Sequence, residues 1–200
     1  MKVILFNGPP RSGKDTVATR VWGDYLTNTK YEVEYERFSF PLKKGLAGFF
    51  DVPYDEFGNN IMEADKDLPR LPNRKTYRQA QISFSEDWAK KFFGPNIFGE
   101  LMVERINTFV AGVESGGIPL ILIPDSGFIE ELEPIVGAFG PSAVAVVKMF
   151  REGCTYEGDS RSYLSQERLD RMGVHTVRLY NDSTPEDLLN MFYDRMKGWL

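Results

Sequence analysis

A glycine-rich loop close to the N-terminus constrains the fold more than any other feature of this sequence. Val3–Phe6 is a short apolar run, and Gly8 and Gly13 follow it five residues apart, directly before Lys14. The apolar run predicts a strand buried on both faces of a parallel sheet, and residues 14–25 have a helical pattern. A strand, two glycines at this spacing, a lysine and a helix make up the Walker A arrangement, whose loop amides and helix dipole attract phosphate.

The loop indicates which side chains would contact a bound nucleotide. We expect Lys14 to bridge the β- and γ-phosphates of ATP, because a lysine at this place in the loop reaches them. A glycine-rich turn that only joins a strand to a helix is the structural alternative. It explains the combination of strand, spacing, lysine and helix less well. The loop residues predicted to bind ATP are Gly8, Arg11, Ser12, Gly13, Lys14, Asp15 and Thr16.

One position departs from the strict motif. Asp15 stands where a serine or threonine holds Mg²⁺, and Thr16 comes one residue later. The carboxylate of Asp15 could bind Mg²⁺, or it could accept a proton from the acceptor. Its structural alternative is an acidic residue that the helix dipole favours in the first turn. The sequence leaves these three roles open, and the metal candidates are Asp15, Thr16 and Asp125.

Composition excludes several kinds of chemistry. Cys154 is the only cysteine and His175 the only histidine among 200 residues. An intrachain disulfide and a cysteine-rich metal site are therefore excluded, and any catalytic triad, Cys-His dyad or zinc site would need that one imidazole. We interpret both residues as structural. We expect the chemistry to depend on lysine, arginine and carboxylate side chains.

Charge and apolar runs indicate where the protein works. The 24 lysines and arginines against 29 aspartates and glutamates give a net charge of −5, which disfavours non-specific binding to nucleic acid or to an anionic membrane. The apolar run at residues 3–6 is too short for a signal peptide, and Ile118–Ile123 is far shorter than a membrane span. We expect a cytoplasmic protein whose partners are small molecules. The sequence leaves a homodimer open.

Strand-like and helix-like patterns alternate along the chain. Such alternation predicts right-handed βαβ units and a sheet covered by helices on both faces. We predict an α/β, three-layer P-loop NTPase fold with five mainly parallel strands, formed by residues 1–200 as a single domain. Expected strands are 3–6, 31–38, 120–123, 143–147 and 175–179, of which 31–38 alternates in polarity and is expected near an edge. Expected helices are 14–25, 41–50, 77–93, 97–113, 128–136, one from about 162 and one after 183.

Two polar places stand out in this pattern. Residues 52–75 are rich in Asp, Asn and Pro and interrupt the alternation, so we interpret them as an insertion on the substrate side. Asp125 ends a predicted central strand, at the edge where open α/β sheets bind ligands. It could hold Mg²⁺ through water or orient the acceptor, and its structural alternative is an N-cap for the next helix.

Several further segments occur in an order that has a family counterpart. Together with Gly-Lys-Asp-Thr after the loop, they resemble the phage-type deoxynucleoside monophosphate kinases, with dephospho-CoA kinase and phosphomevalonate kinase as more distant relatives. The segments are Phe38-Ser39-Phe40-Pro41-Leu42-Lys43, Arg78-Gln79-Ala80-Gln81, Phe93-Gly94-Pro95-Asn96, Ile123-Pro124-Asp125-Ser126-Gly127-Phe128, Arg151-Glu152-Gly153 with Asp159-Ser160-Arg161, and Tyr180-Asn181-Asp182. Three positions depart from the family: Gly127 and Asn96 stand where Arg and Asp are frequent, and Phe98 where Trp is.

The resemblance implies an acceptor site and a lid. About residues 41–115 would form a helical segment on the acceptor side, with Arg78, Lys43, Gln81 and Phe40 as the substrate-binding residues. About residues 151–165 would form a lid that brings Arg151 and Arg161 to the phosphates, although such arginines are often surface ion pairs. Asn181 would lie at the donor base. Its structural alternative is a residue that favours the turn before the last helix.

These patterns lead to one hypothesis and two alternatives. The hypothesis is ATP- and Mg²⁺-dependent transfer of a phosphoryl group to a (deoxy)nucleoside monophosphate, which gives the diphosphate. The catalytic candidates are Lys14, Asp15, Asp125, Arg151 and Arg161. A kinase for another small phosphorylated acceptor, of the dephospho-CoA or phosphomevalonate type, is the second reading. The third is a non-catalytic P-loop switch, for which a second phosphate-binding site has no use.

Overall fold

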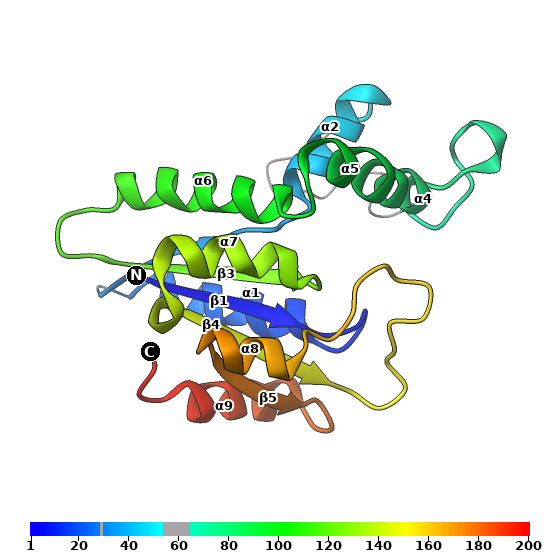
Figure 1. The fold of residues 1–200 in the computed structure, drawn as a ribbon. Coiled ribbons are helices and arrows are strands. Elements are labelled where there is room, and N and C mark those ends of the chain that lie inside the picture. The colour runs from blue at the N-terminus through cyan, green and yellow to red at the C-terminus, as the bar shows by residue number, and fades with distance from the viewer. Residues whose placement is uncertain (29, 54–64) are drawn as a thin grey trace. The chain divides into compact units, whose positions relative to one another are not determined.

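The chain divides into two compact units. The computed structural model describes residues 1–28, 30–53 and 65–200 (Figure 1). Unit 1 comprises Met1–Arg37 and Gly99–Leu200, and unit 2 comprises Phe38–Phe98.

Unit 1 contains a five-stranded parallel sheet. The strands are β1 (Lys2–Asn7), β2 (Tyr31–Tyr35), β3 (Ile118–Ser126), β4 (Val144–Phe150) and β5 (His175–Tyr180), in the order β2-β3-β1-β4-β5. Every pairing between them is parallel (Figure 1). The predicted five strands are confirmed, and the alternating strand at residues 31–35 lies at an edge as expected.

Helices cover both faces of this sheet, as a parallel sheet requires. They are α1 (Lys14–Tyr25), α6 (Ile97–Gly112), α7 (Ile129–Phe139), α8 (Gln166–Met172) and α9 (Pro185–Met196). Ile4 and Phe6 of β1 pack with Val17 of α1 and Phe192 of α9 in one fully buried cluster. Val3 and Leu5, which alternate with them and so point to the other face, are buried too. The three-layer α/β architecture is confirmed.

Unit 2 is helical. It contains α2 (Phe40–Phe49), a short 3₁₀ turn (Pro72–Arg74), α4 (Tyr77–Ile82) and α5 (Lys90–Phe93). Thr76 begins α4 with a capping box, in which its hydroxyl accepts from the backbone N–H of Gln79 at 3.1 Å. Leu46, Ala47 and Tyr77 form a small core between α2 and α4.

The structure differs from the sequence prediction in two helices. The expected helix at 77–93 is interrupted by a π-helical turn, Ser83–Ala89, in which the backbone N–H of Lys90 bonds to the carbonyl of Ser85, five residues earlier. The helix expected from about 162 begins at Gln166. Before it, the hydroxyl of Tyr163 donates to the carbonyl oxygen of Met149 in β4, and the backbone N–H of Leu164 donates to Oδ1 of Asn7 in β1. Of the expected insertion at 52–75, residues 54–64 lie outside the described residues.

Among the helices that the structure describes, none is both long and apolar enough to span a bilayer.

Candidate active site

The loop between β1 and α1 has a conformation that requires glycine at two places. Gly13 has a φ of 96°, and a Cβ there would lie 2.5 Å from Nδ2 of Asn181. A Cβ on Gly8 would lie 2.6 Å from the Ser12 hydroxyl oxygen and 2.8 Å from the carbonyl oxygen of Met149. Arg11 also has a left-handed backbone, with φ 66°. The loop therefore holds a tight, fixed shape around its amides.

Two of the predicted site residues, which follow the carboxyl ends of β4 and β5, form hydrogen bonds to this loop. Asn181, just after β5, donates from Nδ2 to the carbonyl oxygen of Ser12 at 3.0 Å. Arg151, just after β4, donates from Nη1 to the carbonyl oxygen of Arg11 at 3.2 Å. Both side chains thus bond to the backbone of the loop. A direct contact of either one with ATP stays a prediction.

Lys14 lies buried at the first turn of α1. Its Nζ is 3.4 Å from the carbonyl oxygen of Pro9 and 3.5 Å from Oδ2 of Asp15, so both contacts are long. Burial lowers the pKa of Lys14, and nearby Asp15 only partly opposes this. An ammonium group that is desolvated and weakly paired gains much from an anion, and a phosphate group would supply one.

Asp15 is held by an arginine that the sequence motifs do not indicate. Nη2 of Arg37 donates to Oδ1 of Asp15 at 2.6 Å and to the hydroxyl of Tyr35 at 2.9 Å. Burial raises the pKa of Asp15, but Arg37 and then Lys14 outweigh it and hold that pKa below its usual value. The only signal in the sequence is a charged pair, Glu36-Arg37, near the end of the strand predicted at residues 31–38.

Arg105 of α6 fixes the segment that carries Arg37. Its Nε donates to Oε2 of Glu36 at 2.9 Å, and its Nη2 donates to the carbonyl oxygen of Arg37 at 2.8 Å. Nε and Nη1 of Arg37 make no hydrogen bond within residues 1–28, 30–53 and 65–200. Arg37 therefore has a fixed backbone and keeps donors that can bind an anionic oxygen.

Asp125 lies near the end of β3 and is 8% exposed. It interacts electrostatically with Lys14, Arg37 and Arg161. The N-terminus of α7 is satisfied by another acid, because Glu131 accepts from the backbone N–H groups of Gly127 and Phe128 at 3.2 and 3.3 Å. Asp125 is thus not the helix cap that was its structural alternative.

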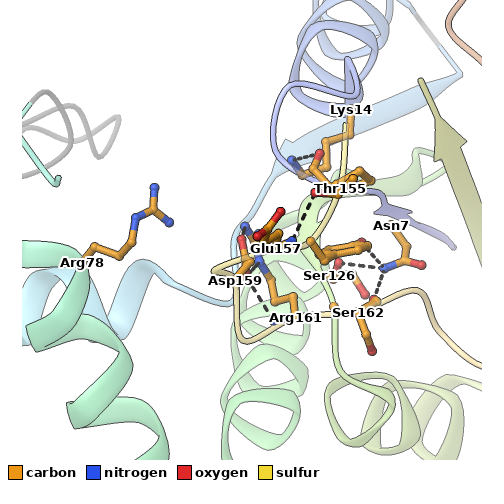
Figure 2. Close-up of polar contacts among 12 residues, drawn as sticks. Asn7, Lys14, Arg78, Ser126, Thr155, Glu157, Asp159, Arg161 and Ser162 are labelled. Atoms are coloured by element: carbon orange, nitrogen blue, oxygen red, sulfur yellow. Dashed lines mark hydrogen bonds and ion pairs between the residues drawn. The ribbon is translucent and has the colours of Figure 1, made fainter. Parts of the chain in front are cut away.

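The predicted lid is fastened to β1 by Asn7, a second residue that the motifs do not indicate. Nδ2 of Asn7 lies 3.1 Å from the carbonyl oxygen of Ser126, 3.1 Å from the hydroxyl of Tyr156 and 3.0 Å from the carbonyl oxygen of Ser162 (Figure 2). Its Oδ1 accepts from the backbone N–H of Leu164 at 2.9 Å. Asn7 is fully buried, so these bonds join the ends of β1 and β3 to the segment after β4.

Arg161 of the same segment is paired with Asp159. Its Nε donates to Oδ1 at 2.9 Å and its Nη2 to Oδ2 at 2.6 Å, a two-pronged arrangement shown in Figure 2. Arg161 is mostly buried and affects the pKa of Lys14 by repulsion. Arg161 thus acts electrostatically on Lys14 and Asp125, and its contact with ATP stays a prediction.

The four predicted acceptor-binding residues all belong to unit 2. Lys43 of α2 is buried, and Phe40 is half-buried in the first turn of the same helix. Arg78 of α4 pairs with Asp67, with 2.5 Å between Nε and Oδ1. Nε2 of Gln81 is buried and has no hydrogen-bond partner among the described residues. Their use in acceptor binding stays a prediction.

The residues expected to hold Mg²⁺ fit an ion bound chiefly by phosphates. In the part of the chain that the structure describes, no three His, Cys, Asp or Glu side chains gather as a metal site. Asp15 and Asp125 both interact with Lys14, and Thr16 is exposed on α1. Mg²⁺ commonly uses one or two carboxylates together with water and substrate phosphates, so this sparse donor set is sufficient.

Comparison with solved structures shows which proteins share this fold. An APS kinase from Mycobacterium tuberculosis, in complex with AMPPNP and APS, is 16% identical, with 98% of each chain covered and a TM-score of 0.50. A gluconokinase from Sinorhizobium meliloti is 10% identical, covering 98% of this chain and 91% of its own, with a TM-score of 0.46. The sequence matches no protein-family model and no curated protein. The likeness at this identity is one of fold: the chain shares the α/β fold of the APS kinase.

Proposed function

We propose that the protein is an ATP-dependent phosphotransferase whose acceptor is itself phosphorylated, a (deoxy)nucleoside monophosphate in the first place. The observation that carries the proposal is the burial of Lys14 beside a loop whose conformation requires Gly8 and Gly13. A desolvated ammonium group with only long contacts is stabilised by an anion, and the loop amides surround that anion.

Three cations divide the work at the donor. Lys14 would draw negative charge from the β- and γ-phosphates, and Arg161 would stabilise charge on the transferred group. Arg37 has unused donors near Asp125 and would contact the phosphate that attacks or leaves. Mg²⁺, when bound with ATP, supplies further charge neutralisation, and Asp15 and Asp125 are the residues that would hold it.

No general base is required when the acceptor is a phosphate monoester. The second pKa of such a group is about 6, so its attacking oxygen is already ionised at neutral pH. This agrees with a site in which Asp15 is engaged by Arg37 and Lys14 and has its pKa held low. The enzyme then contributes position and positive charge instead of proton transfer.

The acceptor residues are proposed from unit 2. The guanidinium of Arg78 can bind a phosphate with two parallel hydrogen bonds, and this would replace its pairing with Asp67. Lys43 would add charge, the buried amide of Gln81 offers an unused donor, and Phe40 would stack on a base.

An acceptor panel tests this function. ADP formation is measured with deoxynucleoside and nucleoside monophosphates, dephospho-CoA and phosphomevalonate, each with and without Mg²⁺. We expect a monophosphate to raise ADP formation far above the rate without acceptor. If only dephospho-CoA or phosphomevalonate raised ADP formation, that compound class would be the acceptor in place of a nucleoside monophosphate. If no compound raised ADP formation, the kinase assignment would be contradicted.

Calorimetry separates the proposal from a nucleotide switch. A phosphotransferase binds the acceptor monophosphate at its own site when a non-hydrolysable ATP analogue already occupies the loop. A switch has one nucleotide site, so the analogue would abolish monophosphate binding.

A further inference from the structure

Gly127, the residue after β3, has a packing requirement unlike that of the loop glycines. A Cβ at this position would lie 2.4 Å from Cβ, 2.4 Å from Cγ and 2.7 Å from Cδ of Arg161. Gly127 is not among the residues with positive φ, so its backbone would accept any side chain. Glycine fits here because the stem of Arg161 occupies the space of a side chain.

Both ends of the Arg161 side chain are fixed. Next to its stem, the backbone N–H of Ser162 donates to the carbonyl oxygen of Gly127 at 3.1 Å. At its head, the guanidinium makes two bonds to Asp159, whose side chain is only 7% exposed. A rotation of Arg161 away from this place would therefore have to break the pair with Asp159.

The position of the guanidinium is chemically useful. Asp125 attracts it, and it repels Lys14, so it acts on two groups of the proposed donor site. An arginine that is already ordered loses little side-chain entropy when a phosphate arrives. Asp159 offsets its charge next to Lys14 until an anion is present.

We propose that Gly127 is a positioning residue, whose missing side chain lets Arg161 pack against the end of β3 with its guanidinium held on Asp159. The inference rests on the proposed function for its effect on catalysis. The geometry itself can be tested without activity.

A pair of glycine variants tests the proposal. In Gly127→Ala the new methyl group displaces Arg161, and we expect kcat to fall roughly a hundredfold or more, with a small change in ATP affinity. Gly137→Ala on α7 is the matched control, because a Cβ there has no heavy atom within 4 Å. We expect it to keep full activity. Equal activity of both variants would overturn the proposal.

A double-mutant comparison separates this effect from general damage. Arg161→Gly removes the three colliding atoms and should itself lower kcat to a similar extent. In that background Gly127→Ala should cause little further loss, because nothing remains to be displaced. Losses that multiply would overturn the proposal.

An NMR measurement distinguishes a failure of the inference from a failure of the function. The Nε–H signal of Arg161, assigned with Arg161→Lys, should be protected from solvent exchange in the wild type and in Gly137→Ala, and lose that protection in Gly127→Ala. Protection retained in Gly127→Ala would overturn the positioning role. Loss of protection in Gly127→Ala, together with a wild type that phosphorylates no acceptor, would support the packing role of Gly127 and contradict the proposed function.

Discussion

Lys14 shows at the scale of a residue how binding chemistry conflicts with stability. Burial of a charged group costs free energy unless a partner compensates it, and the two contacts of Lys14 are both long. We infer that the lysine is present for its ligand and destabilises the protein without it.

Lys14→Met tests this conflict. We expect the variant to bind no ATP and to lose turnover by at least a thousandfold, yet to melt higher than the wild type at neutral pH without nucleotide. The pKa of Lys14 in the folded protein is lowered, so the unfolded chain binds more protons and the stability of the wild type rises with pH in that window. The stability difference between the two proteins should therefore shrink as pH approaches about 10.4. A Lys14→Met protein that melts lower at every pH would contradict this account.

Arg37→Ala tests the arginine that the motifs do not indicate. Loss of Arg37 should raise the pKa of Asp15, measured by carboxylate NMR titration, because Arg37 is the strongest of the cations that lower it. A lowered pKa stabilises the folded state above the unfolded value of about 3.9 and ceases to do so as pH falls through the folded value. The contribution of this ion pair to the stability difference between the wild type and Arg37→Ala should be about 1 kcal/mol or less at pH 7, since Asp15 is half-exposed. That contribution should vanish at acid pH. Arg37→Lys is the control that keeps the charge, and an unchanged pKa of Asp15 in Arg37→Ala would rule out the pair.

At the scale of elements, the site is organised by what holds the strand ends together. Asn7 ends β1, and its amide bonds to groups from β3 and from the segment after β4. The predicted lid, about 151–165, is therefore fastened at its C-terminal part. The pair Asp159 and Arg161 lies just before that anchor.

Asn7→Ala should reduce stability by about 2–4 kcal/mol, because it leaves a buried backbone N–H and two carbonyl groups without partners. Urea unfolding followed by far-UV circular dichroism measures this loss. Asn28→Ala is a suitable control, since Asn28 makes its side-chain bonds in an exposed turn before β2. A loss below about 0.5 kcal/mol for Asn7→Ala would show that the anchor is unimportant.

At the scale of the whole molecule, sequence patterns predict the fold well and the site partly. Buried apolar runs predict the strands, and the loop glycines predict the tight turn between β1 and α1, because burial and tight turns restrict which residues can occur. Arg37 and Asn7 carry no local pattern, since their roles arise only where distant strands end side by side. The π-helical turn at residues 83–89 is likewise invisible to a 3.6-residue period.

The proposed division of labour between the two units has a kinetic consequence. Arg78→Ala in unit 2 should raise the acceptor KM by tenfold or more and leave the affinity for ATP unchanged, because it removes a guanidinium from the acceptor phosphate alone. Arg70→Ala is the control, as Arg70 forms an exposed pair with Asp65. An unchanged acceptor KM in Arg78→Ala would show that Arg78 does not bind the acceptor.

The most direct measurement follows the phosphoryl group itself. ATP labelled with ¹⁸O in the γ-phosphoryl group is incubated with the protein, Mg²⁺ and a deoxynucleoside monophosphate, and the products are identified by mass spectrometry. The account predicts a labelled diphosphate in an amount equal to ADP, and none with Lys14→Met. Label found only in inorganic phosphate, or ATP bound and left intact, would contradict it.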